Sequence, residues 1–197
     1  MQNLNFTYGV MGSAKTAHAL MRKYEFEQQD KKVLLLKPLI ATRDGDKVTK
    51  SRIGLQSDCV TFTKVDNLCE LLKKLGKFDI IMVDEVQFAT SQHIDQLRLI
   101  TIINDLPVYT YGLKTDFQLK LFEGSKRLIE IANEFTELKL CCKCGKDANV
   151  NARIADGKIV LDGEKFLMGS NDKYKAMCYE CYYRTIEQQN LENALKK

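Results

Sequence analysis

Short apolar segments recur along the first two thirds of the chain, and their periodicity predicts β-strands. Leu4, Phe6 and Tyr8 occupy every second position, which is the spacing of one face of a strand. Residues 32–38 form a nearly continuous apolar run that ends at a proline, a pattern typical of a strand buried on both faces of a parallel sheet. Two further strands are predicted at residues 80–83 and 108–112.

Helices are predicted between these strands, because apolar residues there are spaced three or four positions apart. The first helix carries Leu20, Met21 and Tyr24 as its apolar stripe. The alternation of strands and helices predicts an α/β fold, a doubly wound parallel sheet flanked by helices with right-handed crossovers. The predicted helices are residues 17–29, 65–75, 91–104 and 124–135.

The active site is expected at the carboxyl ends of the strands, where such sheets bind their ligands. Gly9 and Glu85 both follow predicted strands and should lie at this edge. Residues 41–58 are polar and predict a long functional loop that carries Arg43 and Arg52.

A phosphate-binding motif follows the first strand. Residues 9–16 read G-x-x-x-x-A-K-T, a P-loop with one substitution. In this motif backbone amides surround the phosphates, Lys15 reaches the β- and γ-phosphate oxygens, and Thr16 holds Mg²⁺. Ala14 replaces the usual glycine, so its methyl group either fits at a cost to the loop geometry or narrows the cradle. The alternative is a turn of small residues that only leads into a helix.

An acidic segment completes the predicted nucleotide site. The strand at 80–83 is followed by Asp84, a position where a carboxylate orders Mg²⁺ and its water molecules. Glu85 is the candidate general base, because a hydroxyl that attacks the γ-phosphorus must lose a proton. An acidic pair could instead cap the helix that follows. The residues predicted to bind the nucleotide are Gly9, Val10, Met11, Gly12, Ser13, Ala14, Lys15, Thr16, Asp84, Val86 and Gln87.

Composition limits the remaining choices. The chain has 197 residues, which suits one domain with a small appendage. It carries 30 Lys and Arg against 26 Asp and Glu, and these charges are spread along the sequence, so no nucleic-acid groove is expected. Neither a secretion signal nor an apolar run of membrane-spanning length is apparent, so we expect a cytoplasmic protein without a membrane partner.

The cysteines indicate a metal site. Five of the seven fall between residues 141 and 181. Cys141 and Cys144 form one C-x-x-C pair and Cys178 and Cys181 a second, the ligand spacing of a four-thiolate zinc site rather than of a disulfide framework. Cys142 leaves the pairing of 142 with 144 open, although the x-x spacing before a glycine favours Cys141. A closed shell of four sulfurs makes the predicted Zn²⁺ structural. The alternative is a set of reduced cysteines without a metal.

The segment between the two cysteine pairs is predicted to form a small lasso. An Asp156-Gly157 turn between apolar alternating runs indicates a hairpin. Residues 166–174 then form an irregular strap held at its base by the metal, which lowers the entropy cost of closing over a ligand. We therefore predict a P-loop nucleotide-binding α/β domain at 1–137, a zinc-binding lasso domain at 138–183 and a polar C-terminal tail at 184–197, with a helix that frays.

Together these residues resemble the type II thymidine kinases, a zinc-containing cytosolic family, from about Leu4 to Tyr182. The family's markers match the P-loop, the segments at 35–38, 42–44, 51–54, 83–88, 111–117, 121–125 and 171–174, and the cysteine pairs. The resemblance implies ATP and Mg²⁺, transfer of the γ-phosphate to the 5′-hydroxyl of thymidine or a related deoxynucleoside, and Glu85 as the proton acceptor. It also implies a homotetramer with feedback inhibition by dTTP. The implied nucleoside-binding residues are Phe88, Phe117, Phe166, Leu167, Met168, Gly169 and Tyr174.

Two positions depart from the family pattern. Ala14 replaces the P-loop glycine, and Ala41 stands where the family usually has an aspartate two residues before the arginine matched by Arg43. These departures motivate one alternative, a nucleotide-binding relative with impaired catalysis. A second alternative is a P-loop ATPase with a nucleic-acid-binding zinc ribbon, in which Glu85 would activate water.

Overall fold

The computed structural model describes residues 3–41, 45, 47–163 and 173–195, and a six-stranded parallel sheet forms its centre. The strand order is β5-β2-β6-β7-β1-β8, and every neighbouring pair runs parallel, as the alternation of strands and helices predicted. The strands are β1 (Leu4–Tyr8), β2 (Val33–Pro38), β5 (Val60–Phe62), β6 (Ile80–Val83), β7 (Val108–Gly112) and β8 (Glu134–Glu137).

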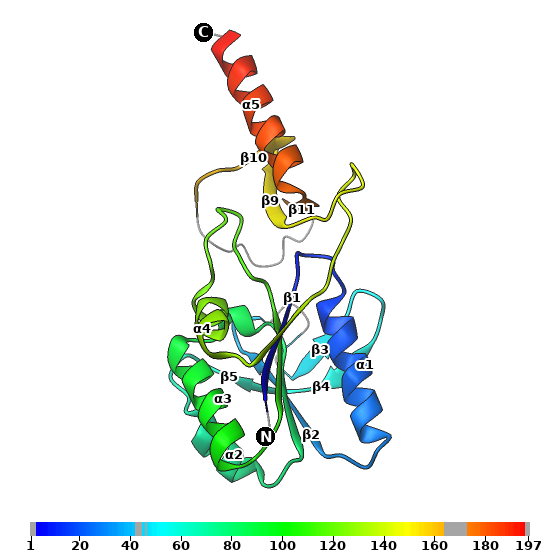
Figure 1. The fold of residues 1–197 in the computed structure, drawn as a ribbon, viewed down its shortest axis with the longest axis vertical. Helices are drawn as coiled ribbons and strands as arrows, with labels where there is room; N and C mark the ends of the chain where they lie inside the picture. Colours follow the sequence, from blue (N-terminus) through cyan, green and yellow to red (C-terminus); the bar gives the residue numbers. More distant parts are fainter. Residues whose placement is uncertain (1–2, 42–44, 46, 164–172, 196–197) are drawn as a thin grey trace.

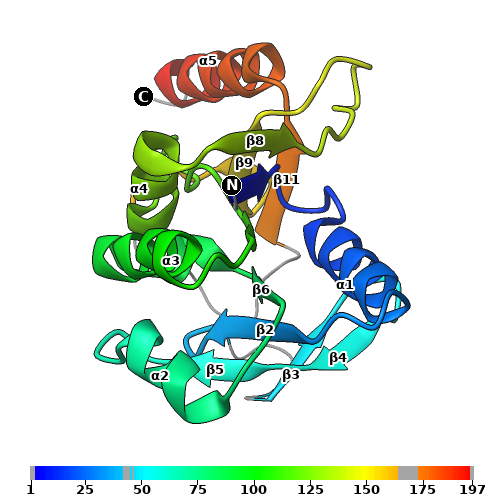
Figure 2. The ribbon, with the colours of Figure 1, turned by 60° about the horizontal axis from the view of Figure 1, so that its bottom comes forward.

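Helices cover both faces of the sheet (Figures 1 and 2). On one face α1 (Lys15–Glu27) packs against β2, β6 and β7. The opposite face carries α2 (Leu68–Leu75), α3 (Ser91–Ile103) and α4 (Glu123–Ile131). Leu4, Phe6, Ile81 and Val83 lie in the larger apolar core under these three helices. The predicted α/β class is thus confirmed.

The central strands are buried on both faces. All four residues of β6 are at most 5% exposed. In β1 the polar Asn5 and Thr7 are buried as well, so the alternation seen in the sequence does not mark a solvent-facing side. Asn5 donates from Nδ2 to the Val108 carbonyl at 3.4 Å, and Thr110 Oγ1 donates to the Asn5 carbonyl at 2.8 Å. These bonds satisfy polar groups that burial would otherwise penalise.

Two of the predicted helices differ from the structure. In α1, Leu20 is buried, but Met21 and Tyr24 are 47% and 62% exposed, so the predicted apolar stripe is wrong. The helix instead meets the sheet through small alanines beside Leu20, which permit close packing. The predicted helix at 124–135 ends at Ile131, and residues after it form β8 beside β1.

The polar segment after β2 contains a hairpin rather than only a loop. Its strands are β3 (Val48–Lys50) and β4 (Gln56–Asp58). The buried Lys37 donates from Nζ to the carbonyl oxygens of Gly45 and Val48, at 3.1 and 2.8 Å. Lys37 thereby ties the hairpin to the end of β2. Arg43 lies outside the described residues.

A smaller region stands above the carboxyl ends of the parallel strands (Figure 1). It contains an antiparallel sheet in the order β10-β9-β11, built from β9 (Val150–Ala155), β10 (Lys158–Ile159) and β11 (Tyr174–Met177). The predicted turn at Asp156 and Gly157 joins β9 to β10, with positive φ at both residues.

The last helix, α5 (Tyr179–Leu195), packs against this small sheet. Gln189 accepts a hydrogen bond from the Ile159 N–H at 2.7 Å and donates one to the Ile159 carbonyl at 3.2 Å. The helix therefore runs without a break across the boundary predicted between residues 183 and 184. Within the part of the chain that the structure describes, none of the helices has the length and apolarity needed to cross a membrane.

Candidate functional site

The carboxyl ends of β1, β6 and β7 bring the predicted nucleotide residues together. The P-loop leaves β1, Asp84 and Glu85 leave β6, and Leu113 leaves β7. The backbone N–H of Asp84 donates to the Leu36 carbonyl of β2 at 2.9 Å, which continues the pairing of β6 with β2 to this residue. The edge of the sheet expected from the strand order is therefore where the charged groups meet.

In the P-loop, Lys15 is directed back over the loop. Its Nζ donates to the carbonyl oxygens of Gly9 and Val10, at 3.0 and 2.8 Å, and lies 3.4 Å from Ser13 Oγ. Burial lowers the pKa of Lys15 to about 8, while the negative charges of Glu85 and Asp84 act in the opposite direction. A lysine so placed can exchange its carbonyl partners for phosphate oxygens.

Loop geometry explains two of its small residues. A Cβ on Gly9 would collide with Ser13 Oγ and lie 2.5 Å from the Leu138 carbonyl oxygen, so only glycine fits there. Ala14 has φ 59° and ψ 24°, the left-handed conformation that favours glycine. The methyl group is thus accommodated at a strain of about 1 kcal/mol, which is the first of the two outcomes that the sequence left open.

Asp84 and Thr16 form the candidate magnesium site. The Thr16 hydroxyl donates to the Asp84 carboxylate, which is only 3% exposed. Burial and the adjacent charge of Glu85 raise the pKa of Asp84 to about 7. A divalent cation such as Mg²⁺, which prefers oxygen ligands, would favour the ionised carboxylate that burial opposes, and the threonine hydroxyl offers a second oxygen beside it. These two residues would hold the ion between the P-loop and β6.

Glu85 stands next to this pair with an unusual backbone. Its φ of 52° places it in the left-handed region, before the short 3₁₀ helix η2 (Val86–Phe88). Its carboxylate lies near enough to Lys15 to raise the pKa of that lysine, and it accepts a hydrogen bond from Gln87 Nε2 at 2.6 Å. The side chain predicted to be the general base is therefore close to the groups predicted to hold the phosphates.

Arg52 also reaches this site, from the turn between β3 and β4. A Cβ built on Gly12 of the P-loop would lie 3.8 Å from Arg52 Nη1, and the arginine charge helps to lower the pKa of Lys15. The sequence suggested a functional loop but assigned Arg52 no contact. Its position adds positive charge where phosphate oxygens are expected.

The predicted nucleoside residues are only partly described. Phe88 packs edge-on against Phe122, with ring centroids 5.8 Å apart. Phe117 is buried beneath the Arg153 guanidinium, 5.2 Å from the ring centroid, and Tyr174 is the strand partner of Arg153. Phe117 and Tyr174 therefore adjoin the same arginine. Phe166, Leu167, Met168 and Gly169 lie outside the described residues.

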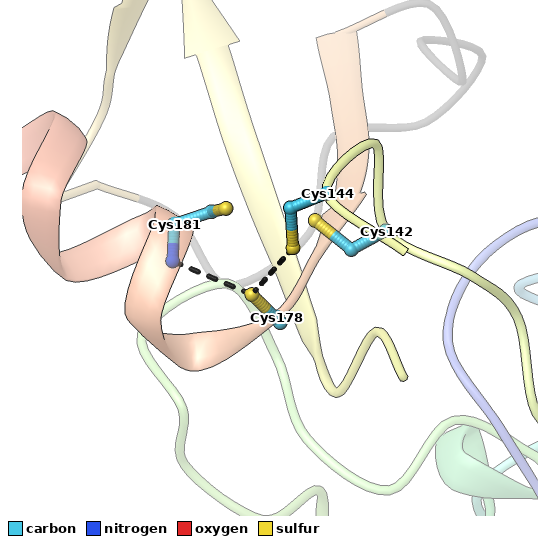
Figure 3. Close-up of side chains that lie close together, drawn as sticks. All are labelled: Cys142, Cys144, Cys178 and Cys181. Atoms are coloured by element: carbon cyan, nitrogen blue, oxygen red, sulfur yellow. Dashed lines mark hydrogen bonds between the residues drawn. The ribbon is translucent and has the colours of Figure 1, made fainter. Parts of the chain in front are cut away.

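Four sulfurs in the upper region have the arrangement of a metal site (Figure 3). Cys142, Cys144, Cys178 and Cys181 point toward one another, and their Sγ atoms all lie within 4.8 Å of each other. Cys144 Sγ is 3.5 Å from Cys178 Sγ, close to the sulfur separation of about 3.8 Å that a tetrahedral zinc thiolate site requires. The cluster therefore has the ligand set of a structural Zn²⁺ site.

Backbone donors favour thiolates in this cluster. The N–H groups of Cys144 and Cys178 donate to the Cys142 sulfur and lower the pKa of its thiol to about 6. The Cys181 N–H donates to Cys178 Sγ at 3.4 Å, while contacts with the other sulfurs raise the pKa of the Cys181 thiol to about 12. Metal binding would replace such shared protons by a cation.

The first ligand differs from the one that the sequence favoured. Cys141 is exposed and outside the cluster, whereas Cys142 is buried within it. The tight turn closes at Cys142, whose N–H donates to the Lys146 carbonyl and whose carbonyl accepts from the Gly145 N–H, at 2.8 and 2.9 Å. Because adjacent side chains of an extended chain point to opposite sides, Cys141 is turned away. Cys142, left as an alternative by the sequence, is the cluster residue.

The two regions are joined by Asn151, which the sequence did not single out. Asn151 is buried on β9, and its Oδ1 accepts a hydrogen bond from the N–H of Met11 in the P-loop at 2.7 Å. Its Nδ2 donates to the Thr115 carbonyl at 3.3 Å. Val10 packs in the same apolar cluster as Cys142 and Val150. The P-loop thus contacts the smaller upper region directly.

The chain is similar to known proteins over most of its length. A family model described as thymidine kinase matches residues 2–182. The thymidine kinase of Rhodopirellula baltica is 37% identical over 182 residues, which cover 90% of this chain and 86% of that protein. The thymidine kinase of Legionella pneumophila strain Lens is 38% identical, covering 93% and 90%. That of Enterococcus faecalis is also 38% identical, covering 93% and 95%.

Solved structures match less well. The large terminase from a thermophilic bacteriophage covers 70% of this chain and 40% of its own, with 9% identity and a TM-score of 0.42, too low to support a conclusion. The sequence matches extend over both the P-loop and the cysteine cluster and reach nearly the full length of each relative. On this evidence the chain belongs to the thymidine kinase family.

Proposed function

We propose that this chain transfers the γ-phosphate of ATP to the 5′-hydroxyl of thymidine, with Glu85 as the general base. The observation that carries the proposal is the cluster of Lys15, Thr16, Asp84 and Glu85 at one edge of the sheet, in a chain of this family. These groups supply the charges that phosphoryl transfer requires.

On the phosphate side, the backbone amides of the P-loop and Lys15 bind and orient the triphosphate. Arg52, from the β3–β4 turn, adds a second cation beside Gly12. When bound between Thr16 and Asp84, Mg²⁺ would neutralise charge on the β- and γ-phosphates. The raised pKa of Asp84 supports this role, because a divalent cation favours the ionised form that burial opposes.

In the transfer itself, the 5′-oxygen of the nucleoside forms a bond to the γ-phosphorus. The bond from that phosphorus to the oxygen bridging the β- and γ-phosphates breaks, and ADP leaves. Glu85 accepts the proton of the 5′-hydroxyl. Its proximity to Lys15 supports this assignment, since the acceptor must lie near the transferred group.

On the nucleoside side, we propose that Phe88, Phe117 and Tyr174 line the pocket, and that the backbone at 166–169, which lies outside the described residues, reads the base. The shared neighbour Arg153 supports a common pocket for Phe117 and Tyr174. The Tyr174 hydroxyl is buried and has no hydrogen-bond partner among the described residues. A polar group of a ligand would satisfy it.

A kinase assay over the natural deoxynucleosides tests the proposal. With Mg·ATP, thymidine should yield thymidine monophosphate at a higher kcat/KM than deoxycytidine, deoxyadenosine or deoxyguanosine. ADP release that needs no nucleoside, together with salt-sensitive DNA binding, would instead identify the ATPase alternative. Deoxyuridine belongs in the panel, because discrimination against it depends on how the base's methyl group is accommodated.

The alternative of a nucleotide-binding relative with impaired catalysis rests on Ala14 and Ala41. Ala14 adopts the left-handed conformation that its place in the loop requires, which supports a working P-loop. If neither the wild type nor Ala14→Gly produces thymidine monophosphate, the impaired reading replaces the proposal. The resemblance also motivates a tetramer and inhibition by dTTP, which light scattering and a dTTP titration of the kinase rate would measure.

A further inference from the structure

The side chain of Gln87 is predicted from the sequence to contact the nucleotide, but its hydrogen bonds are made to other parts of the protein. It lies in η2, directly after the catalytic segment, and is only 2% exposed. Its Nε2 donates to Glu85 Oε2 at 2.6 Å, and its Oε1 accepts from the Leu113 N–H at 3.1 Å. Both ends of the amide are thus engaged inside the protein.

The orientation of this amide follows from its partners. A carboxylate oxygen only accepts hydrogen bonds and a backbone N–H only donates. If the amide were flipped, its oxygen would face the Glu85 carboxylate and its NH₂ group would face the Leu113 N–H. Only the observed orientation satisfies both neighbours, so Gln87 links Glu85 to the chain at the end of β7.

The far end of this link is rigidly supported. A Cβ on Gly112 would lie 2.6 Å from Gln87 Oε1 and 3.0 Å from Val86 Cγ1, so β7 and η2 approach each other at a distance that only glycine permits. The Leu113 carbonyl accepts a hydrogen bond from Ser125 Oγ of α4 at 2.5 Å. The amide of Gln87 therefore rests on a strand end that is itself tied to a helix.

Glu85 needs such support. Its backbone occupies the left-handed region, which is unfavourable for a residue with a side chain. The glutamate side chain has three rotatable bonds and is only half-buried, so its carboxylate would otherwise sample several positions. The hydrogen bond from the buried Gln87 amide favours the one position seen in the structure.

We propose that Gln87 is a positioning residue that holds the Glu85 carboxylate in place for proton transfer, with the Leu113 N–H as its anchor, and that it is not a ligand of the nucleotide. The inference deepens the proposed function and depends on Glu85 being the general base. The Gln87 amide acts on the reaction only through Glu85.

A double-mutant cycle tests this. Gln87→Met keeps the length of the side chain but removes both hydrogen bonds, and we expect kcat for thymidine to fall about 10- to 100-fold, the effect of misplacing a catalytic group by about 1 Å. The KM for ATP should change less than about twofold, because no nucleotide contact is lost. In a Glu85→Gln background the same substitution should lower kcat less than about threefold, since the group it positions is already absent.

The chain offers a matched control in Gln96. This glutamine is also buried, and its Oε1 also accepts from a backbone N–H, that of Leu68, at 2.8 Å. Gln96→Met should leave kcat within about twofold of wild type, although it should lower the melting temperature as Gln87→Met does. Equal losses of kcat in the two variants would overturn the inference.

Other outcomes separate the inference from the function on which it rests. Equal effects of Gln87→Met in both backgrounds, or a raised KM for ATP at unchanged kcat, would overturn the positioning role while Glu85 remains the base. Wild-type turnover in Glu85→Gln would instead show that Glu85 is not the general base, and would overturn the proposed function itself. Should Gln87→Met fail to fold, Gln87→Glu keeps the acceptor for Leu113 but not the donor to Glu85, and the cycle is measured with it under the same expectations.

Discussion

The parallel-sheet end of this molecule, which carries Asp84 and Glu85, is built on the larger apolar core, whereas the upper region, which carries β9, β10, β11 and the four clustered cysteines, is built on a smaller apolar cluster. Asp84 and Glu85 follow β6, whose residues are at most 5% exposed and lie in the centre of a six-stranded sheet. The upper sheet has three strands, one of them only Lys158–Ile159, and its cysteines gather where the apolar cluster is small.

The difference teaches which part of the reaction each end can serve. Proton transfer and phosphate binding need groups fixed to within a fraction of an ångström, and the sheet supplies that rigidity. A nucleoside must enter and leave, and the upper region, which contacts the P-loop through Asn151 and Val10, has the smaller apolar core of the two ends. Changes at Glu85 should therefore alter kcat and changes at the cysteine cluster should alter nucleoside affinity, whereas changes at Asn151, which contacts the P-loop, should alter ATP affinity.

The largest expected effect is at Glu85. Glu85→Gln should lower kcat by about two to four orders of magnitude, the range for loss of a general base, while thymidine binding is retained. Initial rates of thymidine monophosphate formation and calorimetric thymidine binding measure the two quantities. Glu70→Gln, at an exposed position in α2, is the control and should leave both unchanged. A near-normal rate for Glu85→Gln would mean that the proton leaves by another route.

Next in size is the loss of a cluster cysteine. Cys142→Ser should remove zinc from the protein and raise the KM for thymidine about tenfold, equivalent to about 1.4 kcal/mol, with a smaller change in the KM for ATP. Cys178→Ser should behave in the same way. Metal content is measured by mass spectrometry of the purified protein.

Cys141→Ser is the matched control for the cluster, because Cys141 is the neighbouring but exposed cysteine. It should keep about one zinc ion per chain, as a single four-thiolate site requires. If Cys141→Ser loses the metal and Cys142→Ser keeps it, the assignment of the first ligand is reversed. Equal losses of thymidine and ATP affinity in Cys142→Ser would mean that zinc stabilises the whole fold.

A smaller effect is expected at the contact between the two ends. Asn151→Ala removes the acceptor of the Met11 N–H and should raise the KM for ATP about fivefold, since one hydrogen bond contributes about 1 kcal/mol. Steady-state kinetics with varied ATP measure it. The exposed Asn149 lies two residues away, and Asn149→Ala should change this KM less than about twofold. Identical behaviour of the two variants would argue that the P-loop does not depend on the upper region.

The smallest effect concerns stability alone. Ala14→Gly relieves the left-handed strain and should raise the free energy of unfolding by up to about 1 kcal/mol. Ala17→Gly, the same substitution three residues later within α1, should lower it by about 1 kcal/mol. Urea unfolding followed by circular dichroism compares the two. A loss of stability in both variants would contradict the strain assigned to Ala14.

Features set by local sequence were predictable. Lys15, Thr16 and Asp84 form one cluster because their motifs fix both the turn and the strand end on which they lie. Features set by pairing across the fold were not. All four residues of β8 are exposed, and all but Phe135 are polar. They form a strand only because β1 offers an open edge.

The same reasoning explains the site residues that the sequence missed. Cys141 and Cys142 have the same side chain, and which one faces the cluster depends on where a tight turn closes. The anchor of Gln87 is 26 residues away, on another strand. Asn151 meets the P-loop across 140 residues, a separation over which no periodicity carries information. Each of these needs the fold before it can be identified.

The most direct test of the account is the distance between the Glu85 carboxylate and the 5′-oxygen of bound thymidine, in a crystal of the protein with thymidine, Mg²⁺ and a non-hydrolysable ATP analogue. We predict about 2.6–3.2 Å, the reach of a general base, with Gln87 Nε2 still donating to the same carboxylate. A carboxylate turned away from the sugar, with the 5′-oxygen facing some other acceptor, would contradict the account.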